Sequence, residues 1–375
     1  MNRYVAVVML VVVFALTGLG LVMLSSVTAP LSDSANQLQK QLIWLSGAMV
    51  LFSIVGWVDY TVWRRWAWVI FGVSIFMLLL VFVPGIGSRV KGASRWINVL
   101  GFKLQPSEFV RIAWVLLLAH YLAYHQARIR EWKEGFMWPL GWLMIPLILL
   151  RLEPDMGTLI LLGATTLVMM YVAGSRVWPL LSVGGLGGVG VIAMLWMLPE
   201  RRARILAFLH PEEHKEGKFY QIWQGMLAFG SGGTQGLGLG NSRQKMAYLP
   251  ESTTDSIFAI VGEELGFYVA IAVVMAYMVL LVCGLWIALR AKDRFGMLLG
   301  FGLVFGLCVQ ALINIGTVTA SIPPKGMPLP FVSYGGSNLL ICYLAIGLLL
   351  SIHRQSMRAQ RPRAELIIDD TTPRI

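Results

Sequence analysis

Charged side chains are scarce in this chain of 375 residues, because Asp, Glu, Lys and Arg together make up 13% of it. Soluble globular proteins contain about twice that share. Apolar residues account for 57% of the chain, and runs such as 4–24 and 268–289 reach the roughly 20 apolar residues that cross a bilayer as a helix. This composition excludes a soluble globular protein, and the sequence predicts an all-α, polytopic membrane protein.

Cysteine is also rare, and its three residues lie inside apolar runs without metal-like spacing: Cys283, Cys308 and Cys342. We expect small buried side chains there, and neither a disulfide framework nor a cysteine metal site. His210 and His214 have a spacing that metals accept, but Pro211 and the solvated setting argue against a metal site, and we assign no metal ligands. Walker, Rossmann and GxSxG signatures do not occur in a workable context, which disfavours ATP-driven transport.

Ten apolar segments are counted as spans, at about 4–24, 38–57, 67–83, 107–124, 137–150, 157–173, 179–198, 260–290, 296–320 and 333–352. An even number of spans places both termini on one side of the membrane. The loops on that side contain fifteen Lys and Arg residues, so the positive-inside rule marks it as cytoplasmic. The predicted organisation is a membrane domain over 1–353, with one large extracytoplasmic loop at about 199–259, and a flexible cytoplasmic tail over 354–375.

The outer side is more basic than this topology requires. Its short segments carry Arg89, Lys91, Arg95, Lys103 and Lys325, although short loops normally follow the positive-inside rule. Two explanations fit equally: an anionic ligand at the outer face, or contact with anionic lipid headgroups. The formal net charge of +11 is attributed mostly to topology and anionic lipid, and no nucleic-acid partner is expected.

The large outer loop has three parts. Residues 199–225, PERRARILAFLHPEEHKEGKFYQIWQG, are amphipathic enough to lie on the membrane surface. In residues 229–245, FGSGGTQGLGLGNSRQK, glycines could present backbone N–H groups to an anion beside Arg243 and Lys245, although a flexible loop is the commoner explanation. The third part, YLPESTTDSIFAIVGEELG over 248–266, places several carboxylates where the loop turns into an apolar helix.

These carboxylates admit two interpretations. If residues 251–255 are helical, Glu251 and Asp255 share one face at an i, i+4 spacing and are candidates for acid–base chemistry. Equally, they could cap a helix N-terminus and balance its dipole. Glu263 and Glu264 lie deeper, and an acid in a membrane helix is costly, so we expect both to face protein or a wet cavity and to be functional.

A second acid and base, Glu108 and Arg111 in QPSEFVR, are expected to pair and pin helices together rather than to catalyse a reaction. The residues together describe an outward-facing site with a candidate carboxylate base, glycine-rich backbone and several cations. This combination suits attack by a hydroxyl on a carbon that bears a phosphate-type leaving group. The carboxylate would remove the hydroxyl proton, and the cations would stabilise the departing diphosphate.

Four long stretches occur in a specific order: KGASRWINVLGFKLQPSE at 91–108, EPDMGT at 153–158, GLGLGNSRQKMAYLPESTTDSIFAIVGEELG at 236–266 and PPKGMPLPFVSYGGSNLL at 323–340. They resemble the SEDS (FtsW/RodA/SpoVE) family, which makes cell-wall peptidoglycan, over nearly the whole chain through His353. The stretches GLGLGNSRQK and KGMPLPFVSYGGS are most similar to the septal FtsW branch. The resemblance implies a ten-helix peptidoglycan glycosyltransferase that polymerises lipid II at the outer face of the bacterial cytoplasmic (inner) membrane, with enrichment at the septum.

The resemblance also implies partners: a class B penicillin-binding protein (an FtsI-like transpeptidase), other divisome proteins and membrane lipids. Lipid II would be the substrate, and undecaprenyl diphosphate the leaving group. Asp255 matches the essential aspartate of the family, and its basic positions match Arg95, Lys103 and Lys325. The predicted substrate-binding residues are Arg95, Lys103, Lys325, Glu251, Arg243 and Lys245.

Two positions depart from the usual family pattern His-Thr-Asp-Phe, because Thr253 replaces the histidine and Ser256 the phenylalanine. Asp255 is expected to be the general base on the sugar 4-hydroxyl of the acceptor lipid II, and a divalent cation (Mg²⁺ or Mn²⁺) held with help from Asp255 or Glu251 is an optional cofactor. The alternatives are an elongation polymerase of the RodA branch, a lipid II flippase and a non-catalytic division scaffold. The enzyme is favoured because the acid lies in an outer loop, whereas transport sites lie near the bilayer midplane.

Overall fold

Helices dominate the computed structural model, which describes residues 2–29, 34–90, 93–99, 102–197, 220–245, 251–323 and 325–359. Long apolar runs fold this way because a helix pairs its own backbone groups, as a lipid environment requires. In the described part the helices are α1 (Asn2–Thr28), α2 (Ser34–Trp57), α3 (Tyr60–Leu80), α4 (Pro106–Tyr124), α5 (Trp138–Leu152), α6 (Met156–Ala173), α7 (Val177–Met197), α9 (Tyr220–Gly232), α10 (Ile257–Leu289), α11 (Arg294–Val318) and α12 (Gly336–Ala359). A 3₁₀ turn, η1 (Gln126–Arg128), and a π-helical turn, η2 (Lys133–Met137), connect α4 to α5.

Eight of the described helices are long and apolar enough to cross a membrane. The other two predicted spans correspond to α4, which carries Glu108 and Arg111, and to α7, whose apolar part is Val177–Gly190. Every predicted span therefore falls on a helix. The prediction of an all-α, multi-pass membrane protein is confirmed.

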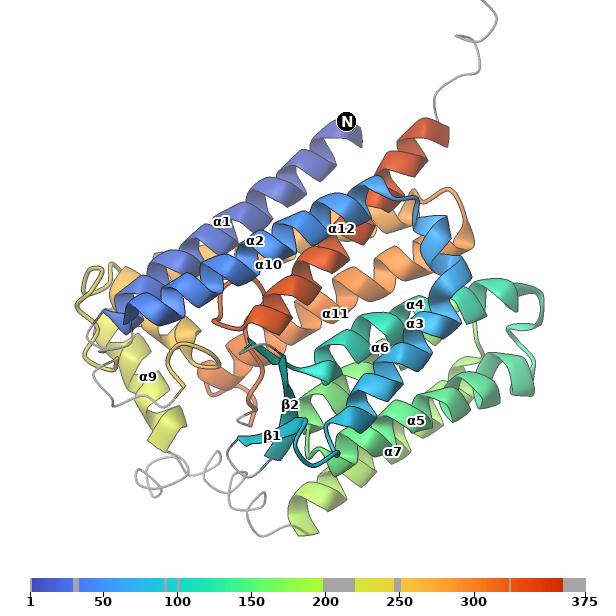
Figure 1. Ribbon diagram of the computed structural model, residues 1–375, viewed down its shortest axis with the longest axis horizontal. Helices are drawn as coiled ribbons and strands as arrows, with labels where there is room; N and C mark the ends of the chain where they lie inside the picture. Colours follow the sequence, from blue (N-terminus) through green and yellow to red (C-terminus); the bar gives the residue numbers. More distant parts are fainter. Residues whose placement is uncertain are drawn as a thin grey trace, which may run out of the picture.

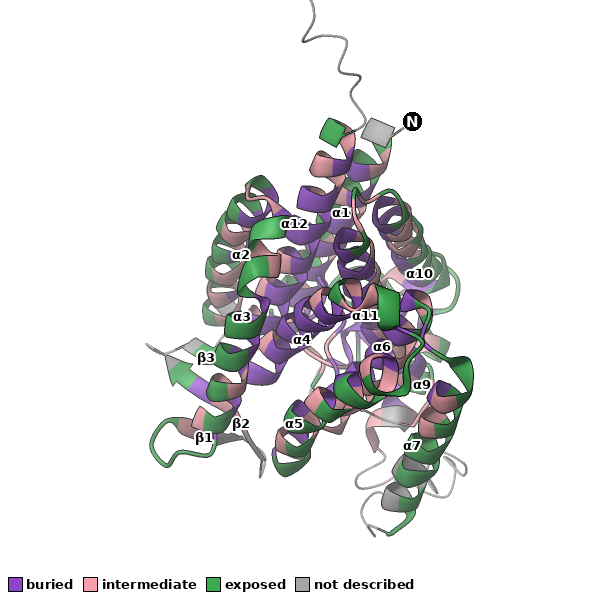
Figure 2. Cartoon of the chain, turned by 90° about the vertical axis from the view of Figure 1, so that its right-hand side faces the viewer, coloured by how far each residue is buried: buried purple, intermediate pink, exposed green. Residues whose placement is uncertain are grey.

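The long helices α1, α2, α10, α11 and α12 run side by side, and α3 to α7 form the rest of the bundle (Figure 1). Helix α4 contacts α3, α6, α11 and α12, and it is largely buried, as is α12 (Figure 2). The beginning of α1 and the end of α12 lie at the same end of the bundle, while α9 and the strands lie toward the other end (Figure 1). This arrangement agrees with the even number of predicted spans.

The last helix extends further than predicted. A flexible tail is predicted from residue 354, whereas α12 continues to Ala359. Two tertiary bonds stabilise this extension: the Arg354 guanidinium donates to the Trp57 carbonyl, and the Ser356 hydroxyl donates to the Arg290 carbonyl. Residues 360–375 lie outside the described part of the chain.

A small antiparallel sheet, which was not predicted from the sequence, occupies the segment between α3 and α4. Its strands are β1 (Gly87–Val90), β2 (Ala93–Val99) and β3 (Phe102–Leu104), in the order β1-β2-β3. The sheet is tied to the helical bundle where Gln105 N donates to the Ser337 hydroxyl at the start of α12 (3.0 Å). It therefore holds the outer basic segment against the bundle.

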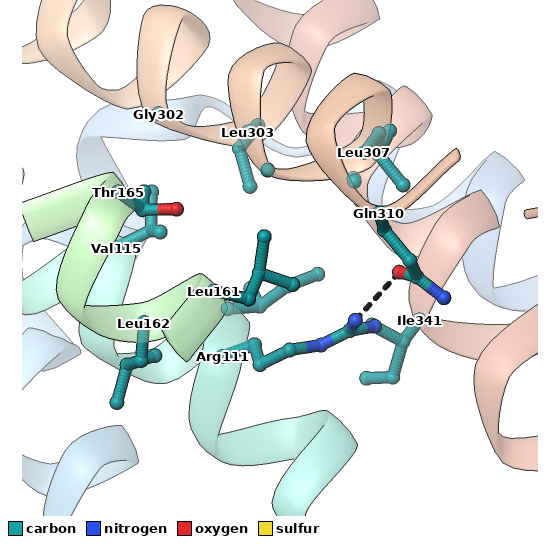
Figure 3. Close-up of a pocket in the computed structure, with 13 residues that line it drawn as sticks. Arg111, Val115, Leu161, Leu162, Thr165, Gly302, Leu303, Leu307, Gln310 and Ile341 are labelled. Atoms are coloured by element: carbon teal, nitrogen blue, oxygen red, sulfur yellow. Dashed lines mark hydrogen bonds between the residues drawn. The ribbon is translucent and has the colours of Figure 1, made fainter. Parts of the chain in front are cut away.

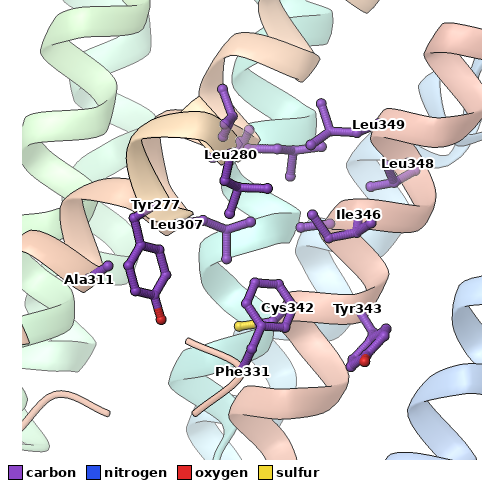
Figure 4. Close-up of a cluster of buried hydrophobic side chains, with 14 of the residues drawn as sticks. Tyr277, Leu280, Leu307, Ala311, Phe331, Cys342, Tyr343, Ile346, Leu348 and Leu349 are labelled. Carbon is purple, nitrogen blue, oxygen red and sulfur yellow. The ribbon is translucent and has the colours of Figure 1, made fainter. Parts of the chain in front are cut away.

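The segment that links α11 to α12 enters the bundle instead of lying on its surface. Phe331 is 2% exposed and packs edge-on against Tyr343, with 5.7 Å between the ring centroids (Figure 4). The Tyr277 hydroxyl donates to the Pro330 carbonyl at 2.5 Å. We call residues 325–335 the re-entrant loop, and its buried apolar contacts fix the position of the candidate site described next.

Candidate functional site

Two loops meet at the end of the bundle that carries the small sheet. One is the re-entrant loop, and the other, residues 251–256, is called the acid loop. Tyr334 N donates to the Thr253 carbonyl (2.9 Å), and the Ser333 hydroxyl donates to the Thr254 carbonyl (2.6 Å). These bonds hold the two loops side by side although they are almost eighty residues apart in the chain.

Asp255 lies at the junction of the two loops and is half-buried. Its Oδ2 faces Gly326 of the re-entrant loop so closely that a Cβ added at Gly326 would lie 2.6 Å from it. The absence of a side chain at Gly326 therefore gives the carboxylate its space. Asp255 is thus a carboxylate at the meeting point of two anchored loops, which is a suitable position for a general base.

Glu251 lies in the same loop but not on a shared helical face with Asp255. Residues 251–256 form turns, α10 begins at Ile257, and Glu251 has a left-handed backbone conformation with φ of 53°. Residues 251–255 are therefore not helical, and the shared helical face that depended on this condition does not exist. Glu251 is exposed, and its Oε2 accepts a hydrogen bond from the Thr254 hydroxyl (3.1 Å).

Two of the predicted substrate-binding cations lie in or next to the re-entrant loop, and a third lies on the small sheet. Lys325 is the half-buried first residue of the re-entrant loop. Lys103 is exposed on β3, and its carbonyl accepts a bond from the Ser337 hydroxyl (3.4 Å) just beyond that loop. Arg95 on β2 is half-buried, and its guanidinium donates to the carbonyl oxygens of Glu153 (3.0 Å) and Pro154 (2.6 Å) in the turn between α5 and α6.

The glycine-rich segment binds two glutamate carboxylates of this same chain. Glu263 and Glu264 of α10 are 0% exposed. Arg243 N donates to Glu263 Oε1 (3.0 Å), and Ser242 N donates to Glu264 Oε1 (3.2 Å). Helix α10 kinks at Gly266, whose φ is 79°, and this glycine lies directly against Gly236 of the segment. The backbone cradle predicted for a ligand is therefore occupied by two carboxylates of the same chain.

Lys245 completes this cluster. Its ammonium forms an ion pair with Glu264 (3.1 Å) and donates to the Gly240 carbonyl (2.6 Å), and the side chain of Lys245 is 5% exposed. The hydroxyl of Ser26 on α1 also donates to Glu264 (2.6 Å). Lys245 therefore connects three segments of the protein, and this geometry does not support its predicted role in substrate binding. Arg243 is exposed, and its predicted role is not affected.

Glu108 and Arg111 form the buried ion pair that the sequence predicts. The guanidinium of Arg111 also donates to Gln310 Oε1 on α11 (2.5 Å), beside a cavity of about 40 Å³ between α4, α6, α11 and α12 (Figure 3). The Gln310 amide in turn donates to the Pro328 carbonyl (2.8 Å). This network links α4 to the re-entrant loop, in agreement with a role in pinning helices.

Glu153, in the turn between α5 and α6, is 1% exposed, and its carboxylate oxygens have no hydrogen-bond partner among the described residues. Burial, and to a smaller degree nearby Asp155, raise the pKa of this carboxyl to about 8 against the opposing effect of Arg95. In the unfolded chain its pKa is near 4.5. At pH values between 4.5 and about 8, the Glu153 carboxyl keeps its proton in the folded protein but has lost it in the unfolded chain. The free energy of unfolding therefore falls as the pH rises through this range.

The Glu153→Gln variant is therefore expected to lose part of the pH dependence of stability. At pH 8 it should be more stable than the wild type by up to about 4 kcal/mol, and near pH 4.5 the two should melt alike. Melting curves of the detergent-solubilised proteins across this range would measure the difference. Parallel pH dependence in the two proteins would show that Glu153 keeps an ordinary pKa.

A metal site held by the protein alone does not fit the described residues. Among them, no group of three or more His, Cys, Asp or Glu side chains lies close enough to hold a metal ion. Asp255 faces Gly326, and Glu251 receives the bond from Thr254. We therefore derive no reaction step through a divalent cation. His210 and His214 lie outside the described residues.

Several residues that build the site were not predicted from the sequence. Gln310 and Asn314, one turn apart on α11, both donate to carbonyls of the re-entrant loop. Gly326 gives space to Asp255, and Ser333 joins the two loops. Two buried amides in an apolar helix were the available signal, because polar groups in a membrane span are rare and usually functional.

Comparison with known proteins identifies the family. A family model described as cell cycle protein, FtsW/RodA/SpoVE, matches residues 6–358. The probable peptidoglycan glycosyltransferase FtsW of Trichlorobacter lovleyi is 42% identical over 350 residues, which cover 92% of each chain. Stage V sporulation protein E of Bacillus subtilis is 38% identical over 93% of this chain and 96% of that protein.

Solved structures have the same fold. A chain from a peptidoglycan synthase complex that coordinates polymerization and crosslinking superposes with a TM-score of 0.77 and 25% identity, covering 93% of this chain and 97% of its own. The rod shape determining protein RodA of Thermus thermophilus gives a TM-score of 0.69 and 24% identity over 93% of this chain and 96% of its own. The resemblance carried by the four sequence stretches is thus confirmed, and the chain belongs to the FtsW/RodA/SpoVE family of cell cycle proteins.

Proposed function

We propose that this protein is a peptidoglycan glycosyltransferase that polymerises lipid II into glycan strands at the outer face of the cytoplasmic membrane during septal division. The observation that carries the proposal is the carboxylate of Asp255, held where the acid loop meets the re-entrant loop and faced by Gly326. Relatives named peptidoglycan glycosyltransferase FtsW support it.

In the proposed reaction, Asp255 accepts the proton from the sugar 4-hydroxyl of the acceptor lipid II. The hydroxyl oxygen forms a bond to the anomeric carbon of the lipid-linked glycan chain as the bond from that carbon to the diphosphate breaks, with inversion. Undecaprenyl diphosphate departs with the electron pair, and the cations of Lys325, Lys103 and Arg95 would offset its charge. Arg95 would do so with the part of its guanidinium that does not bind the α5–α6 turn.

Thr253 requires no chemical role in this scheme. Its carbonyl accepts the bond from Tyr334 N, so the main chain before Asp255 is fixed whichever side chain residue 253 carries. The histidine that is common at this position in the family is therefore not needed to place the carboxylate.

A class B penicillin-binding protein, an FtsI-like transpeptidase, is the proposed partner, and the chain would function within the divisome. The structural neighbour from a complex of polymerization and crosslinking supports a partner of this kind. We also propose that both termini are cytoplasmic, because the beginning of α1 and the end of α12 lie at the same end of the bundle (Figure 1) and the loops predicted on that side are basic.

The test of the proposed activity is the formation of glycan strands from labelled lipid II by the purified protein with its cognate penicillin-binding partner. A polymerase yields strands that grow with time. A flippase would instead move labelled lipid II across a vesicle membrane without elongating it, and a scaffold would do neither. Septal enrichment of a fluorescent fusion separates the septal role from the elongation role, which predicts dispersed lateral patches.

The Gly326→Ala variant should lose activity while remaining folded. The new methyl group would lie 2.6 Å from Oδ2 of Asp255, so the carboxylate must rotate away, and a displacement of about 1 Å can cost up to about 100-fold in rate. Folding should be preserved because Gly326 does not have a positive φ and the Asp255 side chain can move. Gly230→Ala on α9, where a Cβ meets nothing within 4 Å, is the matched control for polymerisation rate and Tm; equal rates in both variants would contradict the packing described.

A further inference from the structure

A single side-chain amide on α11 joins the two loops of the proposed site. Asn314 is 1% exposed. Its Nδ2 donates to the main-chain oxygen of Asp255 (2.8 Å) in the acid loop and to that of Met327 (2.7 Å) in the re-entrant loop. One NH₂ group therefore sets the distance between these two segments of main chain.

The same amide controls both sides of the Asp255 carboxylate. It holds the backbone from which the carboxylate projects, and through Met327 it also holds the neighbouring Gly326, against which Oδ2 lies. Both partners of Nδ2 are carbonyl oxygens, so the donor end of the amide must face them. Asn314 Oδ1 is buried and has no hydrogen-bond partner among the described residues, so the side chain is oriented by its two donor bonds.

We propose that Asn314 is a positioning residue for the glycosyl transfer. It acts through the main chains of Asp255 and Met327 and keeps the carboxylate at the distance and angle at which it can accept the proton of the attacking hydroxyl. The inference rests on the proposed function, in which Asp255 is the base. Proton transfer requires a separation of about 2.6–3.2 Å between heavy atoms, so a small shift of either loop lowers the rate of the chemical step more than it lowers substrate affinity.

The Asn314→Ala variant, assayed as the full chain with its penicillin-binding partner, should show a kcat for lipid II polymerisation lower by about 10- to 100-fold, with KM changed by less than about threefold. Asn314→Asp keeps the shape of the side chain but, when ionised, has no donor, and it should lose as much. Thr317→Ala is the matched control on the same helix, because among the described residues the Thr317 hydroxyl bonds only to the Ile313 carbonyl of its own helix (2.7 Å). If Asn314→Ala does not fold, Asn314→Ser, which keeps one donor, replaces it with a smaller expected loss.

A double-mutant cycle distinguishes positioning from general support of the fold. In an Asp255→Asn background under single-turnover conditions, Asn314→Ala should cause no further loss, because a residue that acts through Asp255 has nothing left to position. A further loss as large as that in the wild-type background would overturn the proposal, as would wild-type kcat in Asn314→Ala. If Asp255→Asn itself polymerises at the wild-type rate, the assignment of Asp255 as the base fails instead. If the wild-type protein forms no glycan strands, the proposed function fails, so these failures are distinguishable.

Discussion

The Asp255→Asn variant is expected to polymerise lipid II about 100- to 10,000-fold more slowly than the wild type, because the amide cannot accept the proton of the attacking hydroxyl. The substitution preserves the size of the side chain, and the main-chain bonds from Asn314 and the re-entrant loop remain possible. The variant should therefore fold and melt like the wild type. Strand formation from labelled lipid II and the apparent Tm are the two measurements.

Asp255→Glu and Glu131→Gln are the controls for this prediction. The glutamate keeps the base but moves it by one methylene, so an intermediate rate is expected. Glu131 is an exposed acid at the opposite end of the bundle, and its neutralisation removes the same charge without affecting the site. A rate for Asp255→Asn that matches that of Glu131→Gln would remove Asp255 from the mechanism.

The Lys245→Met variant should be destabilised by about 3–5 kcal/mol, because it leaves the carboxylate of Glu264 buried without its cation. The Lys245 and Glu264 side chains are 5% and 0% exposed, so water cannot replace the lost partner. The expected result is a fall in apparent Tm of roughly 5–10 °C, measured in the same detergent for all variants.

Two further variants test the cause of that loss. In the double variant Lys245→Met/Glu264→Gln the buried charge is gone, and the glutamine can still accept from Ser26 and Ser242 N, so most of the stability should return. Arg243→Met removes a neighbouring cation that is exposed, and it should cost no more than about 0.5 kcal/mol. Equal melting of Lys245→Met and Arg243→Met would show that the ion pair with Glu264 contributes no stability.

The helices could be predicted from the sequence because their signal is local. A run of about 20 apolar residues specifies a span wherever it packs, so each predicted span coincides with a helix, and the ends differ by a few residues. The largest differences are at α3, which begins at Tyr60 and not at residue 67, and at α12, which continues past residue 353 because Arg354 and Ser356 bond to the main chain of other segments. Such contacts cannot be read from a hydropathy pattern.

The candidate site was only partly predictable, because tertiary contacts between distant segments build it. Asp255 could be found because it is an acid at the start of an apolar segment, and the family resemblance supported its assignment as the catalytic residue. Its neighbours Gly326 and Asn314 come from segments about sixty to seventy residues away, and only the fold brings them together. The glycine-rich segment was considered as an anion cradle, with a flexible loop as the commoner explanation, and the spacing did not reveal that Glu263 and Glu264 of the same chain would bind to it.

The most direct test of the account is a structure of the Asp255→Asn variant, in complex with its penicillin-binding partner, bound to lipid II as acceptor. The account predicts that the acceptor 4-hydroxyl lies about 2.6–3.2 Å from the side-chain oxygen of residue 255, with the diphosphate of the donor site near Lys325 and Lys103. A 4-hydroxyl that lies beyond the reach of residue 255 and contacts another carboxylate, such as Glu108 or Glu153, would contradict it.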